Sequence, residues 1–177
     1  LKEKLKSDTL IRNILPETVV NELNAEGKSD PIMVPNATAI FMDFVNFTAF
    51  TEELPPQELV YILNEHFINF DQIFRDHNVE KLKTIGDGYM AVGGLPKTNN
   101  SHPVDVVLAG MKILLYMQNS KKGKDTPWNL RIGIHTGPMV AGIIGKTKFS
   151  YDVWGSGVNL CARLETSSKP GCINVSH

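Results

Sequence analysis

The chain has 177 residues, of which 42% are hydrophobic, and it carries 18 basic and 19 acidic side chains. This length and composition fit one globular domain with its own hydrophobic core. Because the charges nearly cancel, the composition excludes a strongly basic nucleic-acid-binding protein, and we expect no nucleic-acid partner.

The N-terminal residues, the apolar runs and the cysteines bear on the cellular compartment of the protein. No apolar run in the sequence reaches the ~18 residues that a membrane-spanning helix needs. The chain starts at Leu1 rather than Met and opens without the apolar core of a signal peptide, so we expect a piece of a longer protein. Cys161 and Cys172 form no Cys-x-x-Cys pair, which favours two free thiols in a reducing compartment.

Residues 1–35 are predicted to be an N-terminal helical linker or transmitter segment. Pro16 suits the start of a second helix, and the stretch from Asn24 to Pro35 is typical of a linker. The first helix is either a solvated connecting segment or a coiled-coil transmitter, and its spacing does not decide between the two. Its loose apolar stripe consists of Leu1, Leu5, Ile11 and Leu15.

The first half of the main domain shows a strand, a helix and a hairpin. Ala37 to Phe44 is short and apolar, as a buried strand is, and a long amphipathic helix follows Pro55 and Pro56. Two strand-like segments, 79–85 and 89–93, then flank the sequence Gly-Asp-Gly at 86–88, which is a strong hairpin signal.

The second half predicts a helix over 103–118, a strand over 128–136 that continues through 139–144, a helix over 156–165 and a strand over 171–175. The helix over 103–118 is expected to turn five side chains inward: Val104, Val107, Met111, Leu114 and Leu115. The order of elements indicates an α+β fold, a ferredoxin-like or palm-type βαββαβ antiparallel sheet with helices on one face and a C-terminal extension.

Two aspartates stand where this topology would bring them together. Asp43 ends an apolar strand and Asp87 lies at the tip of the hairpin, and the first strand and the hairpin are neighbours in such a sheet. Two carboxylates at one place suit Mg²⁺ or Mn²⁺ with phosphate oxygens as further ligands. Ordinary turn chemistry at Asp87 and a helix cap near Asp43 explain the same spacing, so both interpretations stay open.

Two further sets of polar residues follow the strands. Lys81 and Lys83 alternate along one strand, which predicts that both lie on one face, either beside a site or as a solvated edge. Asn159 and Arg163 are four residues apart on a predicted helix beside a glycine-rich turn. That helix face is either a site for developing phosphate charge or a plain exposed polar surface.

Four segments resemble the class III nucleotide cyclases, in family order from about Asn36 to the last residue. They are FMDFVNFT at 41–48, KTIGDGYMA at 83–91, RIGIHTG at 131–137, and YDVWG at 151–155 with Asn159 and Arg163-Leu-Glu165. The resemblance implies that residues 36–177 are a cyclase catalytic domain. It would join the ribose 3′-hydroxyl to the α-phosphate of a nucleoside triphosphate and release pyrophosphate.

The resemblance also implies roles for single residues. Asp43 and Asp87 match the ligands of two divalent cations, Mg²⁺ or Mn²⁺, and the backbone carbonyl of Phe44 matches a further ligand. Asn159 matches the residue that orients the ribose, and Arg163 matches the one that neutralises the α-phosphate in the transition state.

The resemblance assigns the choice of base to Lys83 and Asp152. An ammonium can serve N1 of adenine and a carboxylate can accept from its N6 amino group. Guanylate-specific relatives usually carry Glu and a small residue such as Cys there, so the pair implies ATP and an adenylate cyclase. The alternatives are a guanylate cyclase or a catalytically weak nucleotide-binding or relay domain. Lys81 falls where some relatives place a phosphate-binding Arg.

Assembly and context come from the resemblance as well. The family forms each active site between two subunits, and this chain matches both halves, which implies a head-to-tail homodimer. It also implies an upstream sensory or membrane domain and a cytoplasmic position for the catalytic domain. Relatives usually continue past Val175 into another hairpin with a phosphate-binding Lys, so we expect the domain to be truncated at its C-terminus.

Overall fold

One six-stranded sheet organises the chain in the computed structural model, which describes residues 10–120 and 128–177. The strands are β1 (Ile32–Phe44), β2 (Val79–Ile85), β3 (Gly88–Gly93), β4 (Leu130–Ile144), β5 (Ser150–Trp154) and β6 (Cys172–Val175). The helices are α2 (Glu17–Glu26), α3 (Phe47–Glu53), α4 (Pro56–Asp76), α5 (His102–Ser120) and α6 (Ser156–Thr166).

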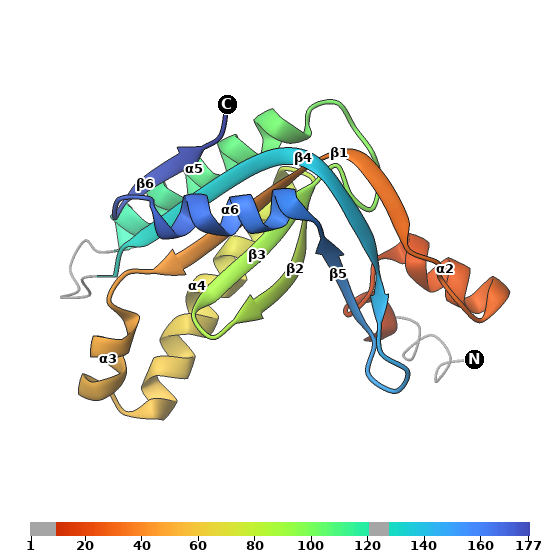
Figure 1. The fold of residues 1–177 in the computed structure, drawn as a ribbon. Coiled ribbons are helices and arrows are strands. Elements are labelled where there is room, and N and C mark those ends of the chain that lie inside the picture. Colours follow the sequence, from red (N-terminus) through yellow and green to blue (C-terminus); the bar gives the residue numbers. More distant parts are fainter. Residues whose placement is uncertain (1–9, 121–127) are drawn as a thin grey trace.

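The strand order confirms the predicted βαββαβ topology. Neighbouring strands run β2-β3-β1-β4-β5, and each of these pairs is antiparallel. The long strand β4 pairs with β1 along one side and with two strands along the other, because its end pairs with β5 and its beginning pairs in parallel with β6. The C-terminal extension therefore adds β5 and β6 beside β4, at one edge of the four-stranded unit (Figure 1).

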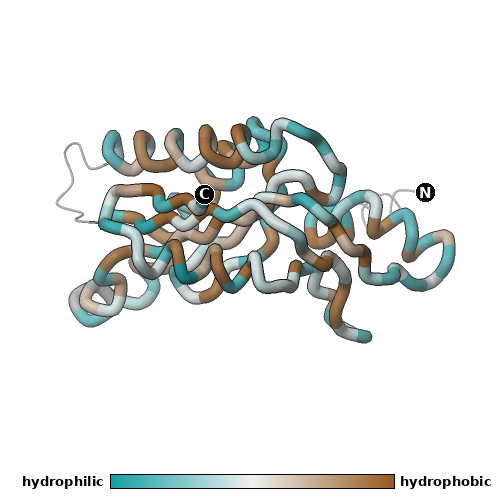
Figure 2. The backbone as a smooth tube through the Cα atoms, turned by 45° about the horizontal axis from the view of Figure 1, so that its top comes forward, coloured by the Kyte–Doolittle hydropathy of each residue, from teal (hydrophilic) through white to brown (hydrophobic). Residues whose placement is uncertain are grey.

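Helices cover both faces of the sheet. The two helices of the βαββαβ unit, α4 and α5, lie together on one face, as predicted, and α6 of the extension crosses the other (Figure 1). Alternation along β1 supplies both layers, because Ile40 and Met42 join the core under α4 and α5 while Ala39 packs with Cys161 of α6. In Figure 2 the central strands are largely apolar and the covering helices alternate in character.

The N-terminal segment differs from its prediction at both ends of the linker expected over 24–35. Helix α2 continues through Glu26 and strand β1 starts at Ile32, so the linker is wrong for its first three and its last four residues. A register shift between Val34 and Ala37 takes the prolyl residue out of the regular ladder, as a bulge does. Val19 and Val20 of α2 are buried in the cluster that contains Val34. The helix expected before Pro16 falls largely on residues 1–9, outside the described residues.

The inward face of α5 was predicted correctly only in part, because Val107 and Leu114 are partly buried against the core but the other three predicted residues are not. Val104, Met111 and Leu115 are 56–60% exposed. The residues that face the sheet instead are Val106, Ala109, Gly110, Ile113 and Met117. Because α5 is apolar on most sides, its periodicity does not select a face, and the small residues Ala109 and Gly110 let the helix approach the sheet closely.

Both cysteines are free, as expected. The buried thiol of Cys161 hydrogen-bonds to the backbone carbonyls of Ala39 and Gly133, both at 3.2 Å, and burial raises the pKa of Cys161 to about 12. Within the described part of the chain, none of the helices has the length and apolar character to cross a bilayer.

Candidate active site

The structure brings the two aspartates together. Asp43 is the penultimate residue of β1, and Asp87 follows Gly86 in the turn between β2 and β3, where Gly86 has a φ of +61°. Burial, and then the neighbouring Asp43 carboxylate, raise the pKa of Asp87 to about 6. Because burial and a neighbouring carboxylate both disfavour the negative charge of Asp87, a cation bound there would relieve that penalty.

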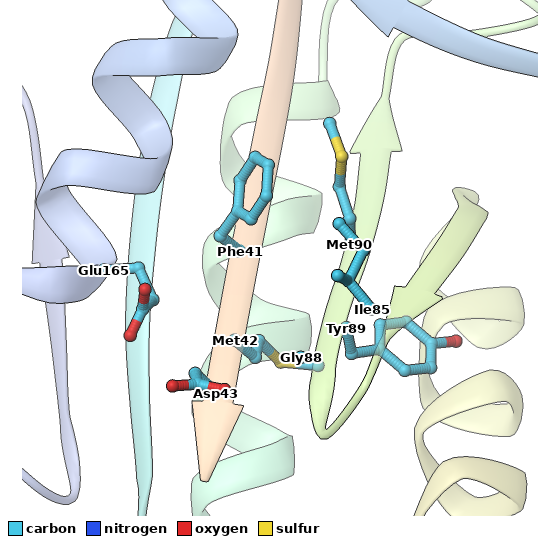
Figure 3. Close-up of a pocket in the computed structure, with 8 residues that line it drawn as sticks. All are labelled: Phe41, Met42, Asp43, Ile85, Gly88, Tyr89, Met90 and Glu165. Atoms are coloured by element: carbon cyan, nitrogen blue, oxygen red, sulfur yellow. The ribbon is translucent and has the colours of Figure 1, made fainter. Parts of the chain in front are cut away.

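A cavity of about 230 Å³ opens beside these residues. Its lining includes Asp43, Gly88 and Glu165, and Figure 3 shows the Glu165 side chain coming from α6 toward the end of β1, where Asp43 lies. Tyr89 points the other way, toward α4 (Figure 3). The cavity thus lies on the face of the sheet that α6 covers.

Asp43 forms an ion pair with an arginine for which the sequence predicted no role. Arg131 of β4 is the cross-strand partner of Asp43, and its Nη2 donates to Asp43 Oδ2 at 2.9 Å. Its Nε lies 3.1 Å from Glu165 Oε1. Burial raises the pKa of Glu165 and the Arg131 charge opposes that rise. The sequence signal for Arg131 and Glu165 was their position alone, because both residues lie inside segments that resemble the cyclases.

The residues present fit a divalent cation at this place. Asp43 and Asp87 offer hard carboxylate oxygens beside an open cavity. The described residues contain no cluster of three or more His, Cys, Asp or Glu, so phosphate oxygens or backbone carbonyls would have to complete the shell. Phe44 suits that role through its backbone, since its side chain is 2% exposed and packs edge-on against Trp128 on the opposite face.

The predicted base-selecting residues contact each other. Lys83 Nζ donates to Asp152 Oδ2, and Asp152 Oδ1 accepts the backbone N–H of Val153 at 2.9 Å. The Lys83 side chain is 34% exposed and that of Asp152 is 12% exposed. The two residues come from opposite ends of the strand order, so the bending of the sheet brings β2 and β5 together. Both polar groups therefore remain at the edge of solvent, available to a ligand.

Lys81 does not share a face with Lys83, so that prediction is wrong. A register shift places Lys81 opposite Ala91 but Lys83 opposite Met90, and these two partners lie on different faces of the sheet. The extra residue reverses the alternation. Lys81 Nζ instead donates to both carboxylate oxygens of Asp71, at 2.8 and 3.1 Å, beside the ring of Tyr89.

Asn159 and Arg163 lie on the same exposed side of α6, as predicted. The side that packs on the sheet consists of Gly157, Cys161 and Glu165. Residues two apart on a helix point in nearly opposite directions, so Arg163 points away from the cavity that Glu165 lines. The structure does not bring Asn159 and Arg163 to the two aspartates of their own chain.

Comparisons with known proteins identify the family of the chain. The model of the adenylate and guanylate cyclase catalytic domain matches residues 31–177. The chain is 37% identical over 179 residues to the receptor-type guanylate cyclase gcy-7 of Caenorhabditis elegans, covering 99% of this chain and 16% of that protein. Further curated relatives at 34–36% identity also carry guanylate cyclase names, and the chain spans 12–16% of their length.

Solved structures of similar shape include cyclases named for either nucleotide. One is the catalytic core of a rhodopsin-guanylyl cyclase with converted specificity, in complex with ATPαS, with a TM-score of 0.79 and 31% identity over 84% of this chain and 80% of that one. Another is the adenylyl cyclase CyaB of P. aeruginosa, with a TM-score of 0.78 and 30% identity over the same shares. The chain belongs to the family of adenylate and guanylate cyclase catalytic domains.

Proposed function

We propose that this domain is an adenylate cyclase, which converts ATP to 3′,5′-cyclic AMP and pyrophosphate. The single observation that carries the choice of ATP is the contact between Lys83 and Asp152. In the reaction, the ribose 3′-hydroxyl gives up its proton to water and its oxygen forms a bond to the α-phosphorus. The bond from that phosphorus to the oxygen it shares with the β-phosphate breaks, and pyrophosphate leaves.

Asp43 and Asp87, with the carbonyl of Phe44, would hold Mg²⁺ or Mn²⁺. Bound divalent cations would neutralise the triphosphate and make the 3′-hydroxyl a better nucleophile. The chain contributes by position: β1 and the β2–β3 turn fix the two carboxylates at one edge of the cavity. Little covalent chemistry is left to the protein, so placement and charge supply most of the rate.

Lys83 and Asp152 would select the base. With adenine bound, the Lys83 ammonium donates to N1 and the Asp152 carboxylate accepts from the N6 amino group. Guanine offers an acceptor at O6 and a donor at N1, so the two groups would be mismatched. Because Asp152 is largely buried, the acceptor O6 of guanine would face the acceptor carboxylate of Asp152 with little water to screen the repulsion, which makes discrimination strong.

The catalytic unit is proposed to be a head-to-tail homodimer with two shared sites. Arg163 and Asn159 point outward from α6, whereas Asp43 lies on the side toward which Glu165 points. One chain therefore presents its aspartates and its Arg163 in different directions. A nucleotide held by the aspartates of one chain would meet Asn159 and Arg163 of a second copy.

A guanylate cyclase is the second candidate, because the curated relatives at 34–37% identity carry guanylate cyclase names. Overall identity reflects the whole domain, whereas the choice of base is proposed to depend on the two side chains of Lys83 and Asp152, which is why we favour ATP. Three of those relatives are named receptor-type, so we also propose that an upstream sensory or membrane domain controls this one, which would then lie on the cytoplasmic side.

The test is to incubate the purified domain at high concentration with Mn²⁺ and either ATP or GTP, and to separate the products by chromatography. We expect cyclic AMP from ATP, lost in Asp87→Ala and retained in Asp76→Ala, an exposed aspartate at the end of α4. Cyclic GMP as the main product would overturn the choice of base. No product from either nucleotide would favour a binding or relay domain.

A further inference from the structure

Arg131 lies between two carboxylates. Its Nη2 donates to Asp43 at 2.9 Å, and its Nε faces Glu165 at 3.1 Å. The three side chains are 28%, 30% and 11% exposed, so all of them are shielded from bulk water to a large extent. One guanidinium therefore serves two anionic partners, of which only Asp43 is a proposed metal ligand.

The two contacts are not equivalent. Within the described part of the chain, Arg131 Nε and Glu165 Oε1 are both buried and neither makes a hydrogen bond, although they lie within ion-pair distance. The distance between Arg131 Nε and Glu165 Oε1 suits a hydrogen bond, but the N–H is not aligned with the oxygen. A buried donor that faces a buried acceptor without bonding to it is unfavourable, and a small rotation of the guanidinium would align the two.

A cation at Asp43 would compete with this arginine. The Asp43 carboxylate, whose Oδ2 accepts from Arg131 Nη2, carries the negative charge that a divalent metal at this place would need. When a metal binds there, Arg131 loses part of its partner and is repelled by the new positive charge. Glu165 is the neighbouring anion that the arginine can turn to, and it already stands at 3.1 Å.

We propose that Arg131 is an internal cation that occupies Asp43 in the metal-free enzyme and turns to Glu165 when a divalent metal binds. Glu165 is then a positioning residue that sets metal affinity through Arg131, without touching the metal. This inference rests on the proposed metal site at Asp43 and goes beyond it, because it assigns a role to two residues outside the ligand set.

The test measures Mn²⁺ affinity by electron paramagnetic resonance of the free ion, with no nucleotide turnover involved. Glu165→Gln removes the alternative partner, so Arg131 stays on Asp43 and Mn²⁺ binding weakens by about 3- to 10-fold. Arg131→Gln removes the competitor, so Mn²⁺ binding tightens. In the Arg131→Gln background, Glu165→Gln should change the affinity by less than about twofold, because its effect needs the arginine.

Four control variants make the result interpretable. Asp43→Asn defines which binding belongs to the site, and Glu58→Gln and Arg75→Gln make the same charge changes at exposed positions of α4. Glu165→Asp keeps the charge and should restore affinity close to that of the unchanged protein. That comparison also tests the proposal if Arg131→Gln does not fold.

Two outcomes would overturn the inference while leaving the metal site intact. One is an equal effect of Glu165→Gln with and without Arg131, which would mean a simple charge effect at a distance. The other is weaker Mn²⁺ binding in Arg131→Gln, which would mean that the arginine only orients Asp43. If instead Asp43→Asn leaves Mn²⁺ binding unchanged, the proposed metal site itself is wrong and this inference fails with it.

Discussion

Gly133 of β4 lies directly beneath Glu165 of α6, so closely that a β-carbon on Gly133 would stand 2.2 Å from the backbone nitrogen of Glu165. It would also stand 2.5 Å from the carbonyl oxygen of Cys161. Only glycine lets the helix settle onto the strand at this point. The contact fixes the height of α6 above the sheet, and with it the positions of Asn159 and Arg163.

Gly133→Ala should therefore displace α6. We expect the free energy of unfolding to fall by about 1–3 kcal/mol, as overpacking does, and cyclase activity to be largely lost. Urea unfolding and product formation measure the two effects. Gly137→Ala is the matched control on the same strand, because its nearest neighbour would be the side chain of His135, which can move. Equal stability of both variants would contradict the close contact.

Asp87 should make the metal-free domain less stable as pH rises. Its pKa is about 6 in the folded chain and 3.8 ordinarily, so the folded state favours the protonated form. The stabilisation is complete below pH 4 and is lost as pH rises through 6. Asp87→Asn stays neutral, so at pH 7 without metal it should be more stable by about 1–2 kcal/mol, after allowance for solvent screening.

Urea unfolding at pH 4 and pH 7 in the presence of a chelator checks this expectation. The same variant should be inactive as a cyclase, since it removes a proposed metal ligand. Asp76→Asn serves as the exposed control and should show no such difference between the two pH values. An Asp87→Asn variant less stable than the unchanged protein at pH 7 would contradict the origin of the shift.

The base preference should follow Lys83 and Asp152. The double change Lys83→Glu and Asp152→Cys replaces the ammonium and the carboxylate that match adenine with groups suited to guanine. We expect kcat/KM for ATP to fall by at least about 100-fold and cyclic GMP formation to appear. Competition between ATP and GTP in one reaction measures the ratio directly. An unchanged preference for ATP would mean that other residues read the base.

Complementation should reveal shared active sites. Asp43→Ala and Arg163→Ala should each be inactive, because each removes one half of both sites in a dimer. When the two variants are mixed, about half of the dimers are mixed and each has one intact site, so about a quarter of the activity should return. Mixing Asp43→Ala with Asp87→Ala is the control and should restore nothing, since both changes fall in the same half.

Lys81 should matter for stability rather than for substrate. Its ammonium pairs with Asp71 near Tyr89, on the opposite face from Lys83. Lys81→Gln should lower the free energy of unfolding by about 0.5–1 kcal/mol and leave KM for ATP within about twofold. A large rise in KM with unchanged stability would instead support the phosphate-binding role that the resemblance implies.

Local sequence determined the order of elements and the proximity of the two aspartates. The apolar strand that ends at Asp43 and the Gly-Asp-Gly turn at Asp87 are local signals, and the βαββαβ order makes their strands neighbours. The pairing of Asn159 with Arg163 on one helix side also follows from spacing alone. Such features could be predicted because they depend on residues close in sequence and on the few ways in which such strands pair.

Features that depend on strand register and on the packing of helices against the sheet were decided only by the tertiary structure. The register shift at Leu82 separates Lys81 from Lys83, and no local signal marks it because a bulge depends on the partner strand. The bend of the sheet joins Lys83 to Asp152 across 69 residues. Arg131 contacts both Asp43 and Glu165 only because α6 packs closely against Gly133. This charge network therefore exists only in the folded chain.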